Sequence, residues 1–439
     1  MTHSNTDVLI IGGGPAGTTF GNLAAKRGWD VTLLEKEQHP RFHIGESVLP
    51  MNLPIIERLG VLDEVREIGV PKLGADFTVA RRGARNETFY FGEALGSSPD
   101  HAFEVRRSEF DDLLFRHCKA AGVKAEEQTT VTTVEKTANG NHKVTAVDAN
   151  GEKRVWETRF LVDASGRDTF LASSNGWKKR NPKHASAAIY GHFRGVERRP
   201  GKDQGNISIY WFDHGWIWMI PLRDDIMSIG AVCCPEYMKK RSGSLDDFLL
   251  NTLSGLDGVR ERIRGAEAAT PARATGNYSY LSERMLGSGY LMVGDAFGFI
   301  DPVFSSGVYL AMNSAERGVD VADAWLTGDA KAYRKACRKY QRDTRKGLST
   351  FARFIYRFRS PAIIHLFGNP QNRFQVLQGV VSMLAGDVYE NRKVRRRLRV
   401  FKTIYALECL LNWRSVRAAW KARRPKDHAG LQASTSPSE

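Results

Sequence analysis

A glycine-rich turn near the N-terminus constrains the fold of this 439-residue chain more than any other feature. An apolar run over residues 7–11 ends at Gly12, and Gly14 and Gly17 complete the spacing GxGxxG. Helical composition follows over 18–27, and residues 31–35 have the pattern of a second strand. The first glycine permits a tight turn, the second lets a pyrophosphate approach the backbone, and the third lets helix and strand pack closely. The segment predicts a Rossmann-type βαβ unit that binds a dinucleotide.

An acidic residue stands where such a unit needs one. Glu35 ends the second strand, and its carboxylate is placed to accept hydrogen bonds from an adenosine ribose. The phosphates are expected at the N-terminus of the helix, where free N–H groups and the helix dipole favour anions. Ala16 and Lys36, which adjoin these positions, are predicted to contact the same dinucleotide.

A second motif distinguishes FAD from other dinucleotides. Residues 291–296 form an apolar strand that ends in Gly-Asp-Ala, which resembles FAD-dependent monooxygenase-like proteins. The resemblance implies that Asp295 binds the ribityl chain of FAD. It also implies that a helix beginning near Gly307 and Val308 directs its positive end at the flavin ring, where it would stabilise a reduced, anionic flavin.

Residues 105–111, Val-Arg-Arg-Ser-Glu-Phe-Asp, resemble the VxRxxFD segment of the same superfamily. There the arginine lies beside the cofactor, which implies a role for Arg107. The alternative of equal weight is that Arg107 is a solvated residue at the start of a helix.

These patterns predict an α/β protein with three parts and a tail. Residues 1–175 and 276–330 are expected to form a discontinuous Rossmann-type FAD-binding domain. The β-forming segments between 176 and 275 predict an antiparallel β-sheet that serves as a substrate domain. Residues 331–424 read as a basic helical region, and residues 425–439 as a disordered tail.

Two further motifs identify a more specific resemblance. Residues 216–221, Trp-Ile-Trp-Met-Ile-Pro, match WxWxIP, and residues 299–307 match FxxPxxSxG. Residues 45–47, Gly-Glu-Ser, stand where flavin-dependent halogenases carry their flavin-loop motif, and Lys72 falls where those enzymes carry a catalytic lysine. The chain therefore resembles flavin-dependent halogenases over roughly residues 5–330.

The resemblance implies a reaction and a site. Reduced FAD and oxygen convert a halide to hypohalous acid, which reaches a separate substrate pocket and meets an electron-rich ring beside Lys72. Trp216 and Trp218, with Pro221, would keep the substrate away from the flavin. Glu46 and Ser47 would contact FAD. Chloride or bromide would bind at Ser306 and Gly307, where backbone N–H groups begin a helix.

Each of these motifs also has a purely structural interpretation. Two tryptophans on one face of a strand usually pack in a core, and Lys72 could be an ordinary loop lysine after a proline. A flavin monooxygenase that acts on a large or protein-bound aromatic substrate without halide is the alternative activity. An FAD protein with a binding or scaffolding role is a third possibility.

Two departures from related enzymes narrow the chemistry. Tryptophan halogenases carry a glutamate in their Pro-Leu-Glu-Ser motif, and Phe304 occupies that position here. Because phenylalanine cannot act as a base, the substrate is expected to be of phenol or pyrrole type. The segment that begins at Asp163 lacks the fuller pattern by which hydroxylases bind NADPH. A separate flavin reductase is therefore expected to supply reduced FAD.

The basic excess of the chain is confined to its last hundred residues. The net charge is +15 overall, and residues 331–430 hold 25 lysines and arginines against 5 acidic residues. Three interpretations stay open: a packed helix with a solvated basic face, a docking surface for an acidic carrier protein that holds the substrate, and peripheral contact with an anionic membrane. Nucleic acid is not expected because no recognition motif accompanies the charge.

Composition sets the remaining expectations. No apolar stretch is long enough to span a bilayer, and the first residues do not resemble a signal peptide. The five cysteines have no metal-ligand or redox spacing, so no metal is expected. The sequence indicates a cytoplasmic enzyme with reduced thiols.

Overall fold

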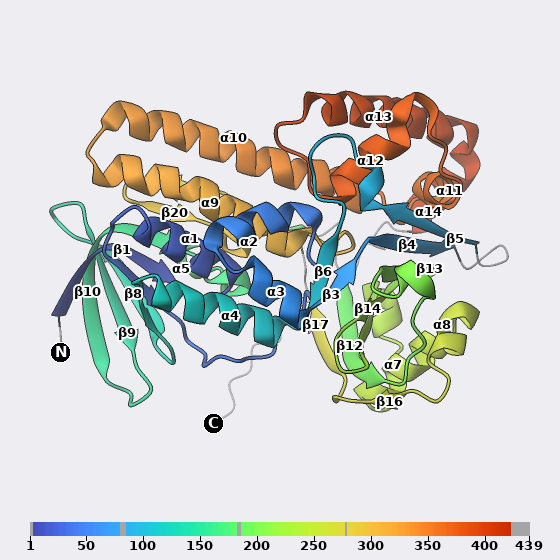
Figure 1. Cartoon of the computed structure of the whole chain (residues 1–439), viewed down its shortest axis with the longest axis horizontal. Coiled ribbons are helices and arrows are strands. Elements are labelled where there is room, and N and C mark those ends of the chain that lie inside the picture. Colours follow the sequence, from blue (N-terminus) through green and yellow to red (C-terminus); the bar gives the residue numbers. More distant parts are fainter. Residues whose placement is uncertain (1–2, 80–84, 182–185, 277–278, 423–439) are drawn as a thin grey trace, which may run out of the picture.

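The computed structural model describes residues 3–79, 85–181, 186–276 and 279–422. One half of the molecule is built on a largely parallel sheet in the order β19-β20-β10-β1-β2-β7 (Figure 1). The antiparallel strands β9 and β8 continue from β10. The strands of this sheet are β1 (His3–Ile11), β2 (Val31–Leu34), β7 (Lys124–Glu126), β8 (Thr130–Lys136), β9 (His142–Val147), β10 (Lys153–Asp163), β19 (Leu286–Gly287) and β20 (Tyr290–Met292).

Helices cover this parallel sheet and complete the FAD-binding half. α1 (Pro15–Ala25) follows β1 directly and packs against α4 (Arg107–Ala120) and α9 (Ser306–Leu326). Pro15 stands in the first turn of α1, where its missing N–H has no partner to lose. The apolar residues of β1 are fully buried beneath these helices. The predicted Rossmann-type unit is therefore present.

A second sheet forms the other half, in the order β16-β12-β15-β14-β13-β4-β5, and β17 also pairs with β12. It is antiparallel apart from the parallel pairing of β13 with β4. Its strands are β4 (Gly74–Val79), β5 (Arg85–Tyr90), β12 (Ala187–Arg194), β13 (Ile207–Phe212), β14 (Gly215–Pro221), β15 (Ile226–Cys233), β16 (Glu267–Ala268) and β17 (Arg273–Gly276).

The composition of this second sheet corrects the sequence-based boundaries in one respect. β4 and β5 come from residues that were assigned to the FAD-binding domain at 1–175, yet they extend the sheet expected from 176–275. β4 forms hydrogen bonds with the edge of β13. Local sequence patterns do not reveal which distant strand will pair with such an edge.

Smaller elements connect the two halves. β3 (Gly69–Lys72) pairs with β6 (Ala102–Val105), and β18 (Tyr280–Ser282) pairs with both β11 (Lys178–Arg180) and β21 (Gly298–Phe299). The short helices are α2 (Leu53–Leu59), α3 (Leu62–Ile68), α5 (Phe170–Ser174), α6 (Pro235–Met238), α7 (Leu245–Ser254) and α8 (Asp257–Arg262).

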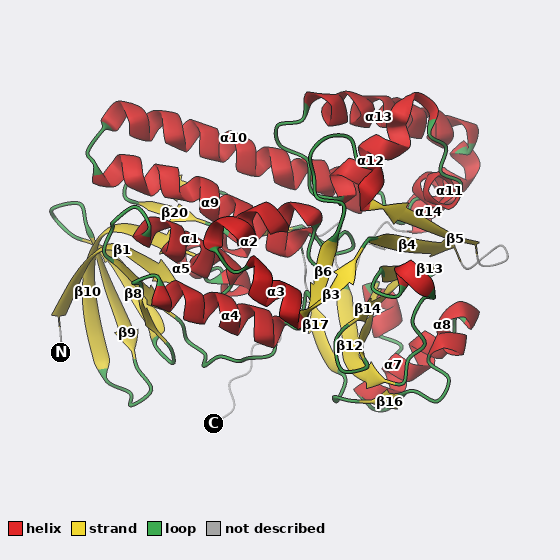
Figure 2. Cartoon of the chain, in the orientation of Figure 1, coloured by secondary structure: helices red, strands yellow, loops and turns green. Residues whose placement is uncertain are grey.

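The C-terminal region is helical, as the sequence predicts (Figure 2). α10 runs back along α9, and the remaining helices gather beside β4 and β5, which α11 contacts directly. These helices are α10 (Ala330–Ile355), α11 (Pro361–Gly368), α12 (Val376–Leu384), α13 (Arg392–Leu411) and α14 (Trp413–Ala422). The expected tail at 425–439 lies outside the described residues. Among the helices described, none is long and apolar enough to cross a membrane.

Candidate active site

A large cavity lies where the two halves of the molecule meet. Its volume is about 420 Å³, within the range of cofactor sites. Its walls include the glycine-rich turn, the end of β2, the loop over 35–47, the WxWxIP strand and the start of α9. Predicted site residues on these walls are Gly12, Gly14, Ala16, Glu35, Lys36, Glu46, Ser47, Arg107, Trp216, Trp218, Asp295, Gly307 and Val308.

The glycine-rich turn has the tight geometry that its spacing predicts. Gly12 has a φ of +102°, and a Cβ there would lie 2.5 Å from the carbonyl oxygen of Ala164. A Cβ on Gly17, which lies behind the cavity wall, would be 1.9 Å from the carbonyl oxygen of Gly12. At Gly14 the nearest atom would be 3.7 Å away, on the Arg41 side chain. The backbone at Gly14 is thus open to a ligand, while Gly12 and Gly17 are required by the fold.

Glu35 is held in place by backbone donors. The Gly13 N–H donates to its Oε2 at 2.6 Å, and the Glu37 N–H donates to its Oε1 at 2.8 Å. Lys36 forms a half-exposed ion pair with Asp168, with Nζ and Oδ2 2.6 Å apart. Both residues directly follow β2 and line the cavity. The adenosine end of a dinucleotide is expected at this place.

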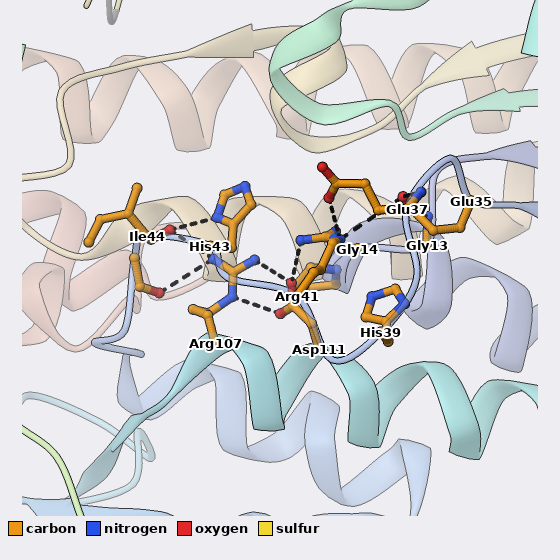
Figure 3. A network of polar contacts seen from close by, with 12 residues as sticks. Gly13, Gly14, Glu35, Glu37, His39, Arg41, His43, Ile44, Arg107 and Asp111 are labelled. Atoms are coloured by element: carbon orange, nitrogen blue, oxygen red, sulfur yellow. Dashed lines mark hydrogen bonds and ion pairs between the residues drawn. The ribbon is translucent and has the colours of Figure 1, made fainter. Parts of the chain in front are cut away.

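Arg107 is buried and bonded, so the solvated interpretation is wrong. Its Nε and Nη2 donate to the two oxygens of Asp111 at 2.7 and 2.8 Å, and its Nη1 donates to the carbonyl of Ile44 at 3.1 Å. Figure 3 shows these contacts fastening the loop that carries Arg41 and His43 against α4. Burial and the nearby Arg107 lower the pKa of His43 to about 4, which leaves this cavity-lining imidazole neutral.

Asp295 is a partly buried carboxyl in the wall of the cavity. Burial raises its pKa to about 6, whereas the positive charges of Arg167 and Arg107 lower it. Such a group is stabilised when it accepts hydrogen bonds from a ligand's hydroxyl groups. Its position at the end of β20, above α9, suits the ribityl hydroxyls of FAD.

Trp216 and Trp218 lie side by side on β14 and line the cavity. Their ring centroids are 5.8 Å apart, and the Nε1 of Trp218 donates to the hydroxyl of Ser228 at 3.3 Å. Both rings belong to the core as well as to the cavity wall, so the two interpretations of the motif are compatible. Gly230 on β15 makes room for the Trp218 ring, because a Cβ there would lie 2.4 Å from it.

Replacing Gly230 by alanine is expected to displace Trp218. The new methyl group would also lie 2.5 Å from the Cβ of Tyr190, and overpacking of this kind costs about 1–3 kcal/mol. Thermal unfolding of the apoprotein should show the loss of stability. Gly276→Ala is the matched control, because no atom of the described residues outside its chain neighbours lies within 4 Å of its Cβ position. Equal stability of the two variants would contradict the expectation.

Lys72 is buried, not a surface loop lysine. It ends β3 with its side chain 1% exposed, and its Nζ donates to the Ser47 hydroxyl and the Val48 carbonyl, both at 2.7 Å. The Ser305 hydroxyl in turn donates to Ser47 at 2.9 Å. Burial lowers the pKa of Lys72, and the nearby Glu104 raises it.

A second, much smaller cavity lies at Lys72. Its volume is about 10 Å³, the space of a single water molecule. Ser305 and Ile207 line both this cavity and the large one, so the two spaces meet at these side chains. A cluster of rings fills the surroundings: Phe77, Phe89, Phe304, Phe358, Phe367 and Trp211.

The start of α9 presents unpaired donors. Ser305 has a φ of +55° and precedes the first turn, whose N–H groups have no acceptor within the helix. The hydroxyl of Ser306 is buried without a partner among the described residues. Gly307 lines the large cavity. Together these groups can hold a small anion.

Comparison with known proteins identifies the chain. A family model described as FAD binding domain matches residues 5–345. The chain is 28% identical to a pyrrole-2-carbonyl-carrier-protein chlorinase of Pseudomonas fluorescens, over 93% of this chain and 95% of that one. It is 34% identical to the tryptophan 2-halogenase of Chondromyces crocatus, over 71% of this chain and 60% of that one. The chain belongs to the flavin-dependent halogenases.

The halogenase also resembles solved structures. A flavoprotein/dehydrogenase from Cytophaga hutchinsonii superimposes with a TM-score of 0.85 and 28% identity, over 93% of this chain and all of that one. The cofactor of the halogenase is FAD, and the enzyme is an FAD-dependent oxidoreductase. The cavity, the open backbone at Gly14 and the Asp295 carboxyl in the cavity wall fit this cofactor.

Several residues that lie beside the predicted site residues were not identified from the sequence. His192 of β12 lies 3.0 Å from Glu46, which ties the flavin loop to the second sheet. Glu104 of β6 lies beside Lys72. Phe358 and Phe367, from the C-terminal region, pack against Phe77, which lines the Lys72 cavity. Of these four residues, only Glu104 could have been suggested by a sequence motif, because it immediately precedes the VxRxxFD segment.

Proposed function

We propose that this halogenase chlorinates or brominates an electron-rich ring, of phenol or pyrrole type, beside Lys72. One observation carries the proposal. The buried amine of Lys72 is joined by Ser47 to Ser305, the residue that lines both the large cavity and the Lys72 cavity. Lys72 is therefore within reach of a small oxidant but separated from the FAD cavity by side chains.

We infer that the large cavity holds FAD along its length. Gly12, Gly14 and Ala16 would face the pyrophosphate, and Glu35 and Lys36 the adenosine, because they lie on the β1–α1–β2 unit. The residues on the flavin side would be Glu46, Ser47, Arg107, Asp295, Gly307 and Val308. Bound in reduced form, the flavin supplies hypohalous acid from oxygen and halide.

The halide would bind at Ser306 and Gly307. The free N–H groups of the first turn of α9 attract anions, and the partnerless hydroxyl of Ser306 can donate one more hydrogen bond. Trp216 and Trp218 wall the same cavity. They would keep an aromatic substrate from the flavin while the smaller oxidant passes.

Lys72 would orient the hypohalous acid by hydrogen bonding. A lysine that donates to the oxygen polarises the oxygen–halogen bond, so that the halogen becomes more electrophilic. Because the two acceptors of hydrogen bonds from Nζ, on Ser47 and Val48, come from one short segment, the amine points in a fixed direction.

The substrate ring needs space that the aromatic cluster now fills. A cavity of about 10 Å³ cannot hold a ring, so binding would require rings at the cavity to move, among them Phe304, which lines it, and Phe367 of α11, which packs against Phe304. Phe304 supplies no base, which favours a ring that is already electron-rich. The Pseudomonas chlorinase takes its pyrrole on a carrier protein, and this likeness supports a carrier-bound substrate here.

A separate flavin reductase would supply the reduced FAD. The Asp163 carboxylate, at the position where hydroxylases engage NADPH, is fully buried and accepts hydrogen bonds from Ser165 N at 3.0 Å and Leu171 N at 2.8 Å. These bonds hold the start of α5. The Asp163 carboxylate thus has a structural role. This supports the proposal that a separate reductase, rather than NADPH bound here, supplies the electrons.

An assay with purified components tests the proposed function. The chain, FAD, a flavin reductase with NADH, oxygen and either chloride or bromide would be incubated with pyrrolyl- or hydroxyphenyl-acyl carrier proteins. Mass spectrometry should find a product with the isotope pattern of one halogen. A hydroxylated product formed without halide would instead support the monooxygenase alternative.

The exposed face of α13 is the proposed docking surface for the acidic carrier protein. Arg395, Arg396 and Arg399 are exposed there, and α13 packs against both α11 and α12. The surface therefore adjoins α11, the helix that carries Phe367 of the aromatic cluster. Electrostatic complementarity accelerates association with an acidic partner.

Charge reversal at this surface is expected to weaken carrier binding. Arg396→Glu/Arg399→Glu should raise the KM for carrier-bound substrate about tenfold, a change of ~1.4 kcal/mol, and should leave FAD affinity unchanged. Arg241→Glu/Arg264→Glu, which reverses two exposed arginines elsewhere, is the control. An unchanged KM, together with lost binding to anionic vesicles, would point to a membrane surface instead.

A further inference from the structure

Glu104 is a buried carboxyl that the proposed mechanism leaves without a role. It lies on β6 and is 0% exposed. β6 pairs antiparallel with β3, with Val70 opposite Glu104 and Lys72 opposite Ala102. Glu104 and Lys72 are thus diagonal neighbours on the two-stranded sheet, and their Oε1 and Nζ atoms are 3.7 Å apart.

The surroundings make Glu104 the natural partner of Lys72. Two of the three hydrogen-bond donors of the Lys72 amine are directed at Ser47 and Val48, and Glu104 is the acid within ion-pair distance. The other carboxyl nearby, Glu46, faces His192 at 3.0 Å across the flavin loop. Both Lys72 and Glu104 are buried, so neither group exchanges a proton freely with bulk water.

Burial moves the proton affinities of the two groups toward each other. It raises the pKa of Glu104 to about 8, which the charge of Lys72 partly offsets. It lowers the pKa of Lys72, which the charge of Glu104 partly offsets. When a buried acid and base have similar proton affinities, a proton passes between them at low cost, and the two titrate as a pair.

We propose that Glu104 is the proton partner of Lys72: the buried pair holds one proton, which Lys72 gives to the reacting species and recovers during turnover. The inference rests on the proposed function, in which hypohalous acid reaches Lys72. Glu104 acts through Lys72 and is therefore a positioning residue rather than a catalytic one.

The reaction needs a group that donates one proton and later accepts one, and the Lys72–Glu104 pair can do both. As the halogen bonds to the ring carbon, the oxygen–halogen bond breaks and the oxygen takes a proton from the Lys72 ammonium, which releases water. The ring then loses the proton from the halogenated carbon. That proton returns to the pair, on the amine or on Glu104, so the net change converts ring and hypohalous acid to halogenated ring and water.

Titration of Lys72 tests the pairing without relying on activity. The full chain with bound FAD would be labelled with lysine carrying ¹³C at Cε, and the Lys72 resonance would be assigned from its absence in Lys72→Arg. In Glu104→Gln no carboxylate stabilises the Lys72 ammonium, so the midpoint of the Lys72 titration should fall by about one pH unit or more. Glu104→Asp should restore most of the shift, and Glu109→Gln, at a partly exposed residue of α4 that pairs with Arg106, should not move it.

The kinetics of the same variants complete the test. Glu104→Gln should lower kcat about 100-fold with little change in the KM for halide or substrate, and should alter the pH profile, whereas Glu104→Asp should recover part of the rate. A Lys72 midpoint that is identical in wild type and Glu104→Gln would overturn the pairing, even if kcat fell. If the wild type does not halogenate at all, the proposed function fails, while the titration still reports on the pair.

Discussion

Replacing Lys72 by methionine is expected to abolish halogenation while the protein still binds FAD. The substitution keeps the buried stem but removes the amine that would polarise the oxidant, and losing one such donor costs on the order of 10²–10³ in rate. Glu104 would remain buried without a cation. Because the charge of Lys72 lowers the pKa of Glu104, that carboxyl should then be protonated and neutral, so the fold should persist.

Product formation and FAD affinity measured on the same sample check this expectation. Lys124→Met is the control, since Lys124 is an exposed lysine paired with Asp30. Hydrogen peroxide or free hypohalous acid should accumulate in the Lys72→Met enzyme if oxygen activation is intact. A variant that halogenates at the wild-type rate would remove Lys72 from the mechanism.

Alanine substitutions in the glycine-rich turn are expected to separate folding from cofactor binding. A Cβ at Gly17 would lie 1.9 Å from the backbone oxygen of Gly12, which cannot yield without shifting α1 away from β1. Gly17→Ala should therefore cost at least the ~1–3 kcal/mol of an overpacked core, lower the apoprotein's unfolding temperature and prevent FAD binding.

Gly14→Ala should leave the fold unchanged and weaken the binding of FAD. Its Cβ would meet only Arg41, at 3.7 Å, so the apoprotein should unfold as the wild type does. The methyl group would instead stand where the pyrophosphate approaches the backbone. We expect the Kd for FAD to rise tenfold or more, about 1.4 kcal/mol, in a fluorescence titration. Wild-type affinity in this variant would mean that the phosphates lie elsewhere.

The parts of the site that sequence reasoning located are those whose function depends on local geometry. Gly12, Gly14 and Gly17 have a spacing that one strand, one turn and one helix dictate. Lys72 and Trp216 each lie on the wall of one of the two cavities, and Ser305 lies on the wall of both. Their chemical roles stay predictions, because geometry alone does not test them.

The parts that sequence reasoning missed depend on contacts between distant segments. β4 joins the second sheet through β13, which is more than 120 residues away in the chain. Glu104 meets Lys72 only because β3 and β6 pair, and Phe358 reaches Phe77 only because the C-terminal helices fold back over β4. No periodicity in a single segment encodes such pairings, since they are fixed by tertiary packing.

The meeting of the two cavities at Ser305 and Ile207 has a consequence for altering this enzyme. We expect the flavin side of this junction to determine whether oxidant is made, and the side chains beyond these two residues to determine which ring carbon the oxidant reaches. Phe304 lines the second cavity and packs against Phe358 and Phe367 of the C-terminal region. None of the three is among the described residues that line the large cavity. We therefore expect selectivity to evolve, or to be redesigned, at these rings while the oxygen-activating machinery stays as it is.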